Sequence, residues 1–175
     1  MAEPSELIGP VPLERSHERT EFRSGSPALD EFLARYALQN QRKHASRTFV
    51  LLRGLRVVAY YTLAFGSISP EDAPRALAAG LGRYPVPILL LARHAVDETE
   101  QARGVGRWLI RDALLRAVQA SSIAGLRAIV VDAKDDAATR FYVRLGFTPF
   151  SENERRLWML LDVVQAALDT PAEAS

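Results

Sequence analysis

The stretch Gln101-Ala102-Arg103-Gly104-Val105-Gly106 decides the fold, because it joins an apolar strand to the most regular helical pattern in the chain. The strand is predicted over residues 88–96, after a Pro-Val-Pro breaker, and the helix over 104–120, where apolar residues recur at helical spacing. The two glycines allow a tight turn, and the first amides of the helix face it. The turn is therefore either an anion site or an ordinary connection. Its spacing matches neither a dinucleotide motif nor a P-loop.

Strands and helices alternate on both sides of this turn. Downstream, the pattern predicts a strand at 128–131, a helix that Asp135 caps and Gly146 ends, and closing strands at 147–150 and 156–161. Upstream, it predicts an amphipathic helix over 28–45, a hairpin of 48–52 and 57–64, and a short helix around 73–81. We expect an α/β (or α+β) fold with helices flanking one mixed, twisted sheet, as a single domain over 1–165 with a frayed tail at 166–175.

Composition excludes several classes of protein. The chain has 175 residues, of which 48% are hydrophobic and 25% are charged, and it has no cysteine. A disulfide scaffold, a thiolate nucleophile and a zinc ribbon are therefore excluded, and His17, His44 and His94 lack metal-ligand spacing. No apolar run approaches the roughly 20 residues of a membrane span, and the N-terminus does not resemble a secretory signal. We expect a soluble, cytoplasmic protein that binds no metal.

Charge is distributed unevenly although the net charge is only +1. Residues 1–31 contain seven acids and three bases, whereas residues 32–70 contain six bases and no acid. The bases of the second stretch are Arg35, Arg42, Lys43, Arg47, Arg53 and Arg56. This stretch indicates either a polyanionic partner or ordinary solvated charge.

The turn at 101–106 and the segment at 141–147 together resemble the GCN5-related N-acetyltransferase (GNAT) family. The turn at 101–106 matches the family's acyl-CoA loop, Gln/Arg-x-x-Gly-x-Gly/Ala. The segment Phe141-Tyr142-Val143-Arg144-Leu145-Gly146-Phe147 matches the family's Phe-Tyr-x-x-x-Gly-Phe block. The resemblance covers residues 85–150 and implies a GNAT fold, acetyl-CoA as the donor and acyltransferase activity.

Further segments resemble a narrower group, the acetyltransferase toxins of bacterial toxin–antitoxin pairs. They lie at residues 28–33, 45–50, 60–64, 87–93 and 131–135. This resemblance implies acetylation of the α-amino group of aminoacyl-tRNA, arrest of translation, neutralisation by a ribbon-helix-helix antitoxin, and a homodimer. One departure is Ser24-Gly25 where the group usually has Cys-Gly, which removes a thiol and leaves catalysis untouched.

The resemblance also implies roles for single residues. Tyr142 holds the position of the general acid that protonates the departing thiolate. The strand at 92–96 would splay from its neighbour to hold the pantetheine arm, while the amides of 103–106 hold the pyrophosphate. The residues expected to bind the donor are Leu91, Ala92, His94, Ala95, Val96, Gln101, Ala102, Arg103, Gly104, Val105, Gly106, Arg107, Asp132, Lys134, Ala137, Ala138 and Phe141.

Basic residues are the candidates for RNA contact. They are Arg35, Arg42, Lys43, Arg47, Arg75, Arg83 and Arg93. The first four could also, or instead, receive an acidic antitoxin segment, whereas the last three flank the expected acceptor side. Asp97, Glu98 and Glu100 are the candidates for a general base. None is required, because an α-amino group titrates near pH 8 and is already partly neutral, on the order of a tenth, in the cytoplasm.

Two other functions remain open on the sequence alone. The first is a GNAT enzyme that acetylates a small amine or a protein amine, although acidic rather than basic residues would suit a small cationic acceptor. The second is a non-catalytic module that senses acyl-CoA, in which Tyr142 and the complete loop would have no purpose.

Overall fold

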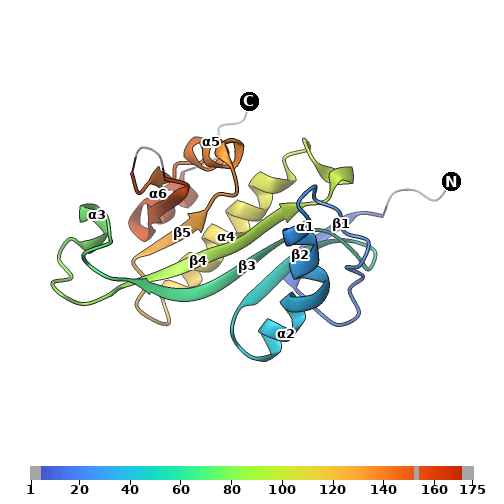
Figure 1. The fold of residues 1–175 in the computed structure, drawn as a ribbon, viewed down its shortest axis with the longest axis horizontal. Helices are drawn as coiled ribbons and strands as arrows, with labels where there is room; N and C mark the ends of the chain where they lie inside the picture. The colour runs from blue at the N-terminus through green and yellow to red at the C-terminus, as the bar shows by residue number, and fades with distance from the viewer. Residues whose placement is uncertain (1–4, 152–153, 171–175) are drawn as a thin grey trace. The chain divides into compact units, whose positions relative to one another are not determined.

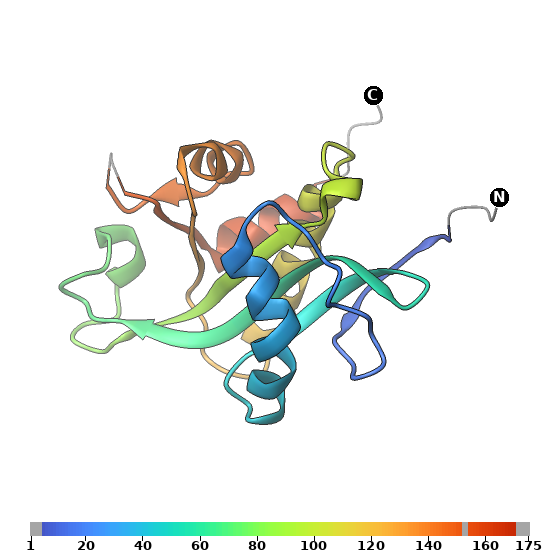
Figure 2. The same ribbon diagram turned by 45° about the vertical axis from the view of Figure 1, so that its right-hand side comes forward.

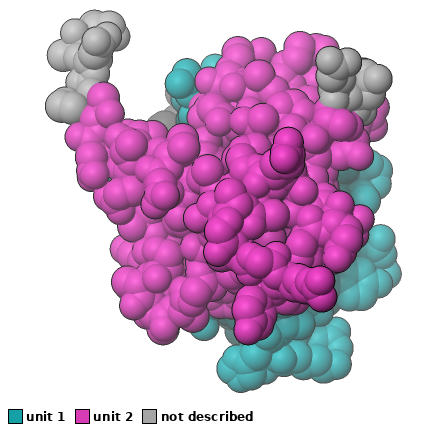
Figure 3. All heavy atoms as spheres, turned by 90° about the vertical axis from the view of Figure 1, so that its left-hand side faces the viewer, with its two compact units in different colours: residues 1–64, 92–113 teal, residues 65–91, 114–175 magenta. Residues whose placement is uncertain are grey.

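The computed structural model describes residues 5–151 and 154–170 (Figure 1). Its strands form a seven-stranded sheet in the order β1-β2-β3-β4-β5-β7-β6. The chain divides into two compact units (Figure 3). Unit 1 comprises residues 1–64 and 92–113, and unit 2 comprises residues 65–91 and 114–175. Three elements contribute residues to both units, namely β3 (Arg56–Ile68), β4 (Val86–Val96) and α4 (Val105–Ser121). The predicted α/β class is confirmed.

Unit 1 contains an antiparallel ladder. β1 (Leu7–Pro12) pairs with β2 (Arg47–Arg53), and β2 pairs with β3 across a tight turn. Gly54 in this turn has φ +61°, in the left-handed region that glycine adopts without a steric penalty. The predicted hairpin is thus confirmed. The sequence pattern did not predict β1, because a Gly-Pro pair in its centre reads as a breaker.

A helical run covers this ladder within unit 1 (Figure 2). Its consecutive segments are α1 (Pro27–Glu31), the π-helical η1 (Phe32–Tyr36) and α2 (Ala37–Arg42). Phe32, Leu33 and Ala37 are buried in one cluster with Val50 and Tyr60 of the strands. Burial of this apolar face is the main source of the stability of the run.

The run ends earlier than the sequence predicted. The predicted helix over 28–45 stops at Arg42, and His44 adopts a left-handed φ of 57°. The amide of Ala45 then bonds to the carbonyl of Asn40 at 2.9 Å and closes the end of the helix. The apolar spacing could not show this boundary, since it continues past the residue that turns the backbone.

Unit 2 contains the parallel pairing that makes the sheet mixed. Its complete elements are α3 (Arg75–Ala78), β5 (Ala128–Asp132), α5 (Asp136–Arg144), β6 (Thr148–Pro149), β7 (Arg156–Leu160) and α6 (Leu161–Asp169). β4 runs parallel to β5, with Ile88 opposite Ala128, while β7 is antiparallel to both β5 and β6. The core residues of this unit include Ile68, Leu77, Val86, Ile88, Ala128 and Val130.

The boundaries of α5 agree with the sequence prediction. The Asp135 side chain accepts a hydrogen bond of 2.8 Å from the amide of Ala138, as an N-cap residue does. After the helix, Gly146 adopts a left-handed φ of 102°. The N-cap aspartate and the glycine after the helix can both be recognised in the sequence, because each residue type favours the backbone position that it holds here.

The expected tail over 166–175 begins inside a helix. Helix α6 continues through Asp169, and its Val164 is fully buried. Residues 171–175 of the expected tail lie outside the described residues. Within the described ranges, no helix has the length and apolar character needed to cross a bilayer. No cluster of His, Asp and Glu in these ranges could hold a metal ion.

Candidate functional site

The loop before α4 has the backbone form of an anion-binding turn. It follows the 3-10 segment η2 (Glu98–Glu100), and both Ala102 (φ 62°) and Gly104 (φ 79°) are left-handed. Among the described residues, the amides of 103–106 have no hydrogen-bond acceptor, and the first helical bond runs from Trp108 to the carbonyl of Gly104 at 3.1 Å. A run of unpaired amides at a helix start fits a phosphate group.

Gln101 anchors the loop through its side chain. Its Nε2 donates to the carbonyl of Val96 at 2.9 Å and to the carbonyl of Ser24 at 3.0 Å. Ser24 is itself fixed by Asp30, which accepts hydrogen bonds from its amide and its hydroxyl. The side chain of Gln101 therefore fixes the loop backbone to its surroundings.

Asp97 is committed to structure and not to base catalysis. Its carboxylate accepts bonds from the amide of Arg23 (2.9 Å) and from the amide and hydroxyl of Thr99, and it contacts Arg56 at 3.3 Å. Burial alone would raise the pKa of Asp97, but the bonds from Arg23 and Thr99 and the charge of Arg56 together lower it. An acid held in this way is a poor proton acceptor.

Glu100 is held more tightly still. It is only 3% exposed and pairs with Arg53 through two contacts, while Arg103 lies 3.7 Å away. The hydrogen bond from Arg53 lowers the pKa of Glu100 against the opposing effect of burial. Glu98, in contrast, is exposed, and its amide donates to the carbonyl of Arg23. Two of the three candidate bases are thus ion-paired.

The end of β4 carries two polar side chains with defined contacts in unit 1. A ring nitrogen of His94 lies 3.2 Å from the carbonyl oxygen of Gly106, so His94 supports the loop. The guanidinium of Arg93 lies over the ring of Phe32 at 4.6 Å and donates to the carbonyl of Ala92 at 2.8 Å. Arg93 is therefore less available to an RNA backbone than its sequence position suggests.

Tyr142 is buried in unit 2 among aromatic rings. It is 5% exposed and packs edge-on against Phe141 and Phe147, with ring centroids 5.3 Å and 5.6 Å away. Burial raises the pKa of Tyr142 above its ordinary value of 10.0. A tyrosine hydroxyl is already protonated at neutral pH, as a proton donor must be, and burial shifts it further in the same direction.

The expected donor-binding residues beyond β5 are unequally exposed. Asp132 is engaged by Arg156 at 2.8 Å and 3.0 Å, and the carbonyl of Lys134 accepts a bond from Arg155. Ala137 lies exposed in the first turn of α5. On β4, Leu91 and Ala95 are buried, with 1% and 5% exposure, whereas Ala92 and Val96 are partly exposed.

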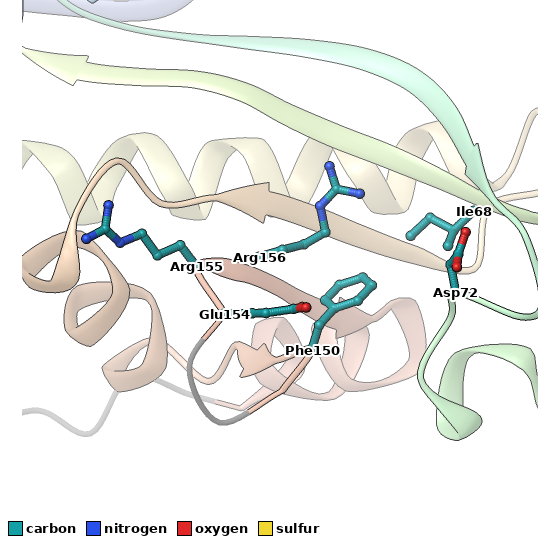
Figure 4. A pocket seen from close by; sticks show the side chains of 6 residues that line it. All are labelled: Ile68, Asp72, Phe150, Glu154, Arg155 and Arg156. Carbon is teal, nitrogen blue, oxygen red and sulfur yellow. The ribbon is translucent and has the colours of Figure 1, made fainter.

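A cavity of about 470 Å³ in unit 2 was not predicted from the sequence (Figure 4). Its lining consists of Ile68, Asp72, Phe150, Glu154, Arg155 and Arg156. The guanidinium of Arg156 lies 5.9 Å from the ring of Phe150. The only sequence signal was a basic-aromatic pattern in the closing strands, which is equally typical of a solvated sheet edge.

Three of the six bases in the acid-free stretch over 32–70 are paired with acids in the folded protein. Arg53 and Arg56 are neutralised by Glu100 and Asp97, and Arg35 forms an exposed pair with its helical neighbour Glu31 at 3.3 Å. Its three other bases are exposed and form no ion pair with a described residue, namely Arg42, Lys43 and Arg47. They follow one another at the end of α2 and the start of β2. In unit 2, Arg75 and Arg83 are also exposed.

A family model described as an acetyltransferase (GNAT) domain matches residues 44–149. A tRNA-acetylating toxin of Mycobacterium tuberculosis (strain ATCC 25618 / H37Rv) is 44% identical over 149 residues, which cover 85% of this chain and 89% of the toxin.

Solved structures agree with this match. The toxin AtaT in complex with acetyl-methionyl-tRNAfMet superposes with a TM-score of 0.80 at 25% identity, over 93% of this chain and 97% of that chain. A tyrosine-to-phenylalanine mutant of AtaT, bound to acetyl-CoA and to the C-terminus of the antitoxin AtaR, gives a TM-score of 0.77 at 25% identity, over 94% of this chain and 97% of that chain.

Proposed function

Because the chain belongs to the GNAT acetyltransferase family, we propose that it transfers the acetyl group of acetyl-CoA to the α-amino group of aminoacyl-tRNA. An acetylated amino group can no longer act as a nucleophile, so the enzyme would be a toxin that stops translation. The observation that carries this proposal is the 44% identity to a tRNA-acetylating toxin over 85% of the chain.

The loop before α4 supports acetyl-CoA as the donor. Its amides at 103–106 are open to a pyrophosphate group, and the side chains of Arg103 and Arg107 are exposed beside them. Gln101 and His94 hold the backbone that carries these amides. When bound, acetyl-CoA supplies an acetyl group that is activated as a thioester.

Tyr142 is the proposed proton donor. Its hydroxyl is protonated at neutral pH, and the flanking aromatic rings fix the direction of the side chain. A thiol has an ordinary pKa of about 8.5, so donation of a proton to the departing sulfur assists the transfer. AtaT has been solved with acetyl-CoA as a tyrosine-to-phenylalanine mutant.

The acceptor side suits an amine that needs little activation. Asp97 and Glu100 are held by arginines, so neither is available to remove a proton. An α-amino group titrates near pH 8, and on the order of a tenth is neutral at cytoplasmic pH without any base. The exposed bases Arg42, Lys43 and Arg47 support a polyanionic acceptor.

We also propose that an antitoxin of the ribbon-helix-helix type neutralises the protein and that the active form is a homodimer in the cytoplasm. The antitoxin part is supported by AtaT, which has been solved with the C-terminus of its antitoxin. Co-expression with the protein encoded beside it should restore growth, and light scattering should give twice the mass of one chain.

The direct test is incubation with labelled acetyl-CoA and total charged tRNA, followed by digestion and identification of the labelled product. We expect an N-acetylated amino acid released from tRNA. Uncharged tRNA is the control, since it lacks the amine. Label on free amines or on protein lysines, with none on charged tRNA, would replace this proposal by the alternative of a small-amine or protein acetyltransferase.

A further inference from the structure

The β2–β3 hairpin carries an arginine on each side of its turn, and each arginine pairs with a buried acid of the segment before the loop. Arg53 contacts Glu100 through two guanidinium nitrogens, with the longer contact at 3.2 Å. Arg56 lies 3.3 Å from Asp97. The two pairs bracket η2 and so fix the chain directly before residue 101.

Backbone bonds hold the same segment in place. The amide of Asp97 donates to the carbonyl of Val58, and the amide of Glu98 donates to the carbonyl of Arg23, both at 2.8 Å. The two acids are almost completely covered, with Asp97 at 1% and Glu100 at 3% exposure. Because an unpaired buried carboxylate is strongly unfavourable, each acid must keep a cation beside it.

Glu100 has two cations within reach, and they differ in exposure. The side chain of Arg53 is 25% exposed and makes the close, two-nitrogen contact. The side chain of Arg103 is 64% exposed and lies farther away, at 3.7 Å. Arg53 is thus the principal partner of Glu100, and Arg103 is the secondary one.

This inequality has a consequence for the loop. Arg103 belongs to the turn whose amides are open to an anion. While Arg53 neutralises Glu100, the guanidinium of Arg103 can turn toward that anion at little cost. Without Arg53, Arg103 would be the remaining cation close to Glu100 among the described residues, and Glu100 would hold it.

We infer that Arg53 is a positioning residue for the acetyl donor: by neutralising Glu100, it leaves Arg103 available to the pyrophosphate at loop 101–106. The inference rests on the proposed use of acetyl-CoA. It gives the hairpin a part in donor affinity although Arg53 lies outside the family's loop motif and acts on the loop through Glu100.

The test is calorimetric titration of acetyl-CoA, and separately of free CoA, into purified variants. Arg53→Met should raise the dissociation constant for both ligands by about tenfold, the effect expected for loss of one charge-assisted contact. Arg103→Met should have the same effect, and the double variant with Arg53→Met should be no weaker than Arg103→Met alone, because both act on one interaction.

Glu100→Gln in the Arg53→Met background is the decisive variant. It removes the charge that captures Arg103, so affinity should return to within about threefold of wild type. It also removes both members of the buried pair together, which is tolerated better than loss of one. A purely structural role for Arg53 predicts the opposite, namely that the double variant binds as weakly as Arg53→Met or more weakly.

Two further measurements separate positioning from folding. In steady-state assays, KM for acetyl-CoA should rise while kcat stays within about twofold, since the effect is on ground-state binding. If Arg53→Met does not fold, Arg53→Lys takes its place, with an expected loss of about threefold that Glu100→Gln again removes.

Arg35→Met is the matched control, since it breaks an arginine–glutamate pair of unit 1 that does not contact the loop. It should leave acetyl-CoA affinity unchanged. Wild-type affinity in Arg53→Met, or no recovery with Glu100→Gln, would overturn the inference while the donor proposal stands. Failure of the wild-type protein to bind acetyl-CoA would overturn the donor proposal and the inference with it.

Discussion

The loop before α4 and the tyrosine of α5 are held in opposite ways. The loop depends on polar contacts with residues 41, 47 and 77 positions away in the sequence. Asp97 and Glu100 contact arginine side chains, and the side chain of Gln101 donates to a main-chain carbonyl. Tyr142 depends on Phe141 and Phe147, which belong to its own helix and the turn after it. A polar network works only when all its members are present, whereas aromatic packing tolerates the loss of one polar atom.

The largest expected effect lies in the aromatic region. Tyr142→Phe keeps the ring and its packing but removes the proton that this position can donate. We expect kcat to fall by about 10² to 10⁴, the usual range for general acid–base assistance, with acetyl-CoA affinity within a few-fold of wild type. Single-turnover acetylation of charged tRNA measures the rate, and calorimetry measures the affinity.

Thermal unfolding should show that this variant is as stable as the wild type. In cells, the same change should relieve growth arrest. Full single-turnover activity would mean that sulfur departs unassisted or through water, and Tyr142 would then be a packing residue alone.

The second prediction concerns Gly104 in the loop before α4. Gly104 has φ +79° and open space around its missing Cβ, so a side chain there is strained by the backbone and not by contact. Gly104→Glu adds a negative charge beside the open amides, and we expect acetyl-CoA affinity to fall by about 100-fold.

Gly104→Ala is the matched control, because it introduces the same strain without the charge. It should lose less affinity than the glutamate variant. Equal affinity of a folded Gly104→Glu protein and the wild type would remove this turn from the donor site.

A third, smaller effect concerns the exposed bases at the end of α2. Reversal of Arg42 and Lys43 to Glu should slow acetylation of charged tRNA by about tenfold at low salt, because these residues would attract the RNA backbone. The difference from wild type should shrink at high salt, where the attraction is screened.

The control reverses two other exposed arginines, Arg15 and Arg111, and so changes the net charge equally. Acetyl-CoA affinity should be unchanged in both double variants. Equal rates for the Arg42 and Lys43 variant and the wild type at low salt would place the RNA elsewhere.

The smallest effect is on the pH dependence of the free energy of unfolding. The acids before the loop lower stability at acid pH, whereas Tyr142 lowers it at alkaline pH. The pKa values of Asp97 and Glu100 lie below their ordinary values, so below about pH 5 the unfolded chain takes up protons first and the free energy of unfolding falls. The raised pKa of Tyr142 acts at the other end, where stability is lost as pH rises above about 10.

Denaturant unfolding between about pH 5 and 2 checks this sign. Glu100→Gln should flatten the acid slope, and Tyr142→Phe should leave that slope as it is. An unchanged slope in Glu100→Gln would mean that this carboxyl titrates alike in the folded and unfolded chains.

The sequence predicts what neighbouring residues determine. The hairpin, the N-cap at Asp135 and the end of helix α5 at Gly146 follow from local chemistry, and each is confirmed. The likeness of the loop and of the Phe-Tyr block to the GNAT family also lies in contiguous residues, and the family is confirmed. The roles of the individual site residues remain predictions.

The sequence does not show what distant residues decide. Nothing in the sequence near Arg53 reveals that it pairs with Glu100. The run of bases therefore predicted more unpaired positive charge than the folded protein has. The acids of η2 look like solvated loop residues until their partners are known. The cavity of unit 2 is likewise lined by residues that lie as far apart in the sequence as Ile68 and Arg156, so no short stretch of sequence contains them all.

The separation of 47 positions between Arg53 and Glu100 also sets an order of events during synthesis. The ribosome releases the β2–β3 hairpin well before it releases Glu100. The contact between Arg53 and Glu100 can form only after both residues have been released, and it requires closure of the long segment between them. The donor loop therefore acquires its final form late, after most of the chain has been made. A partner that binds earlier-made segments would meet the nascent chain before it could use acetyl-CoA.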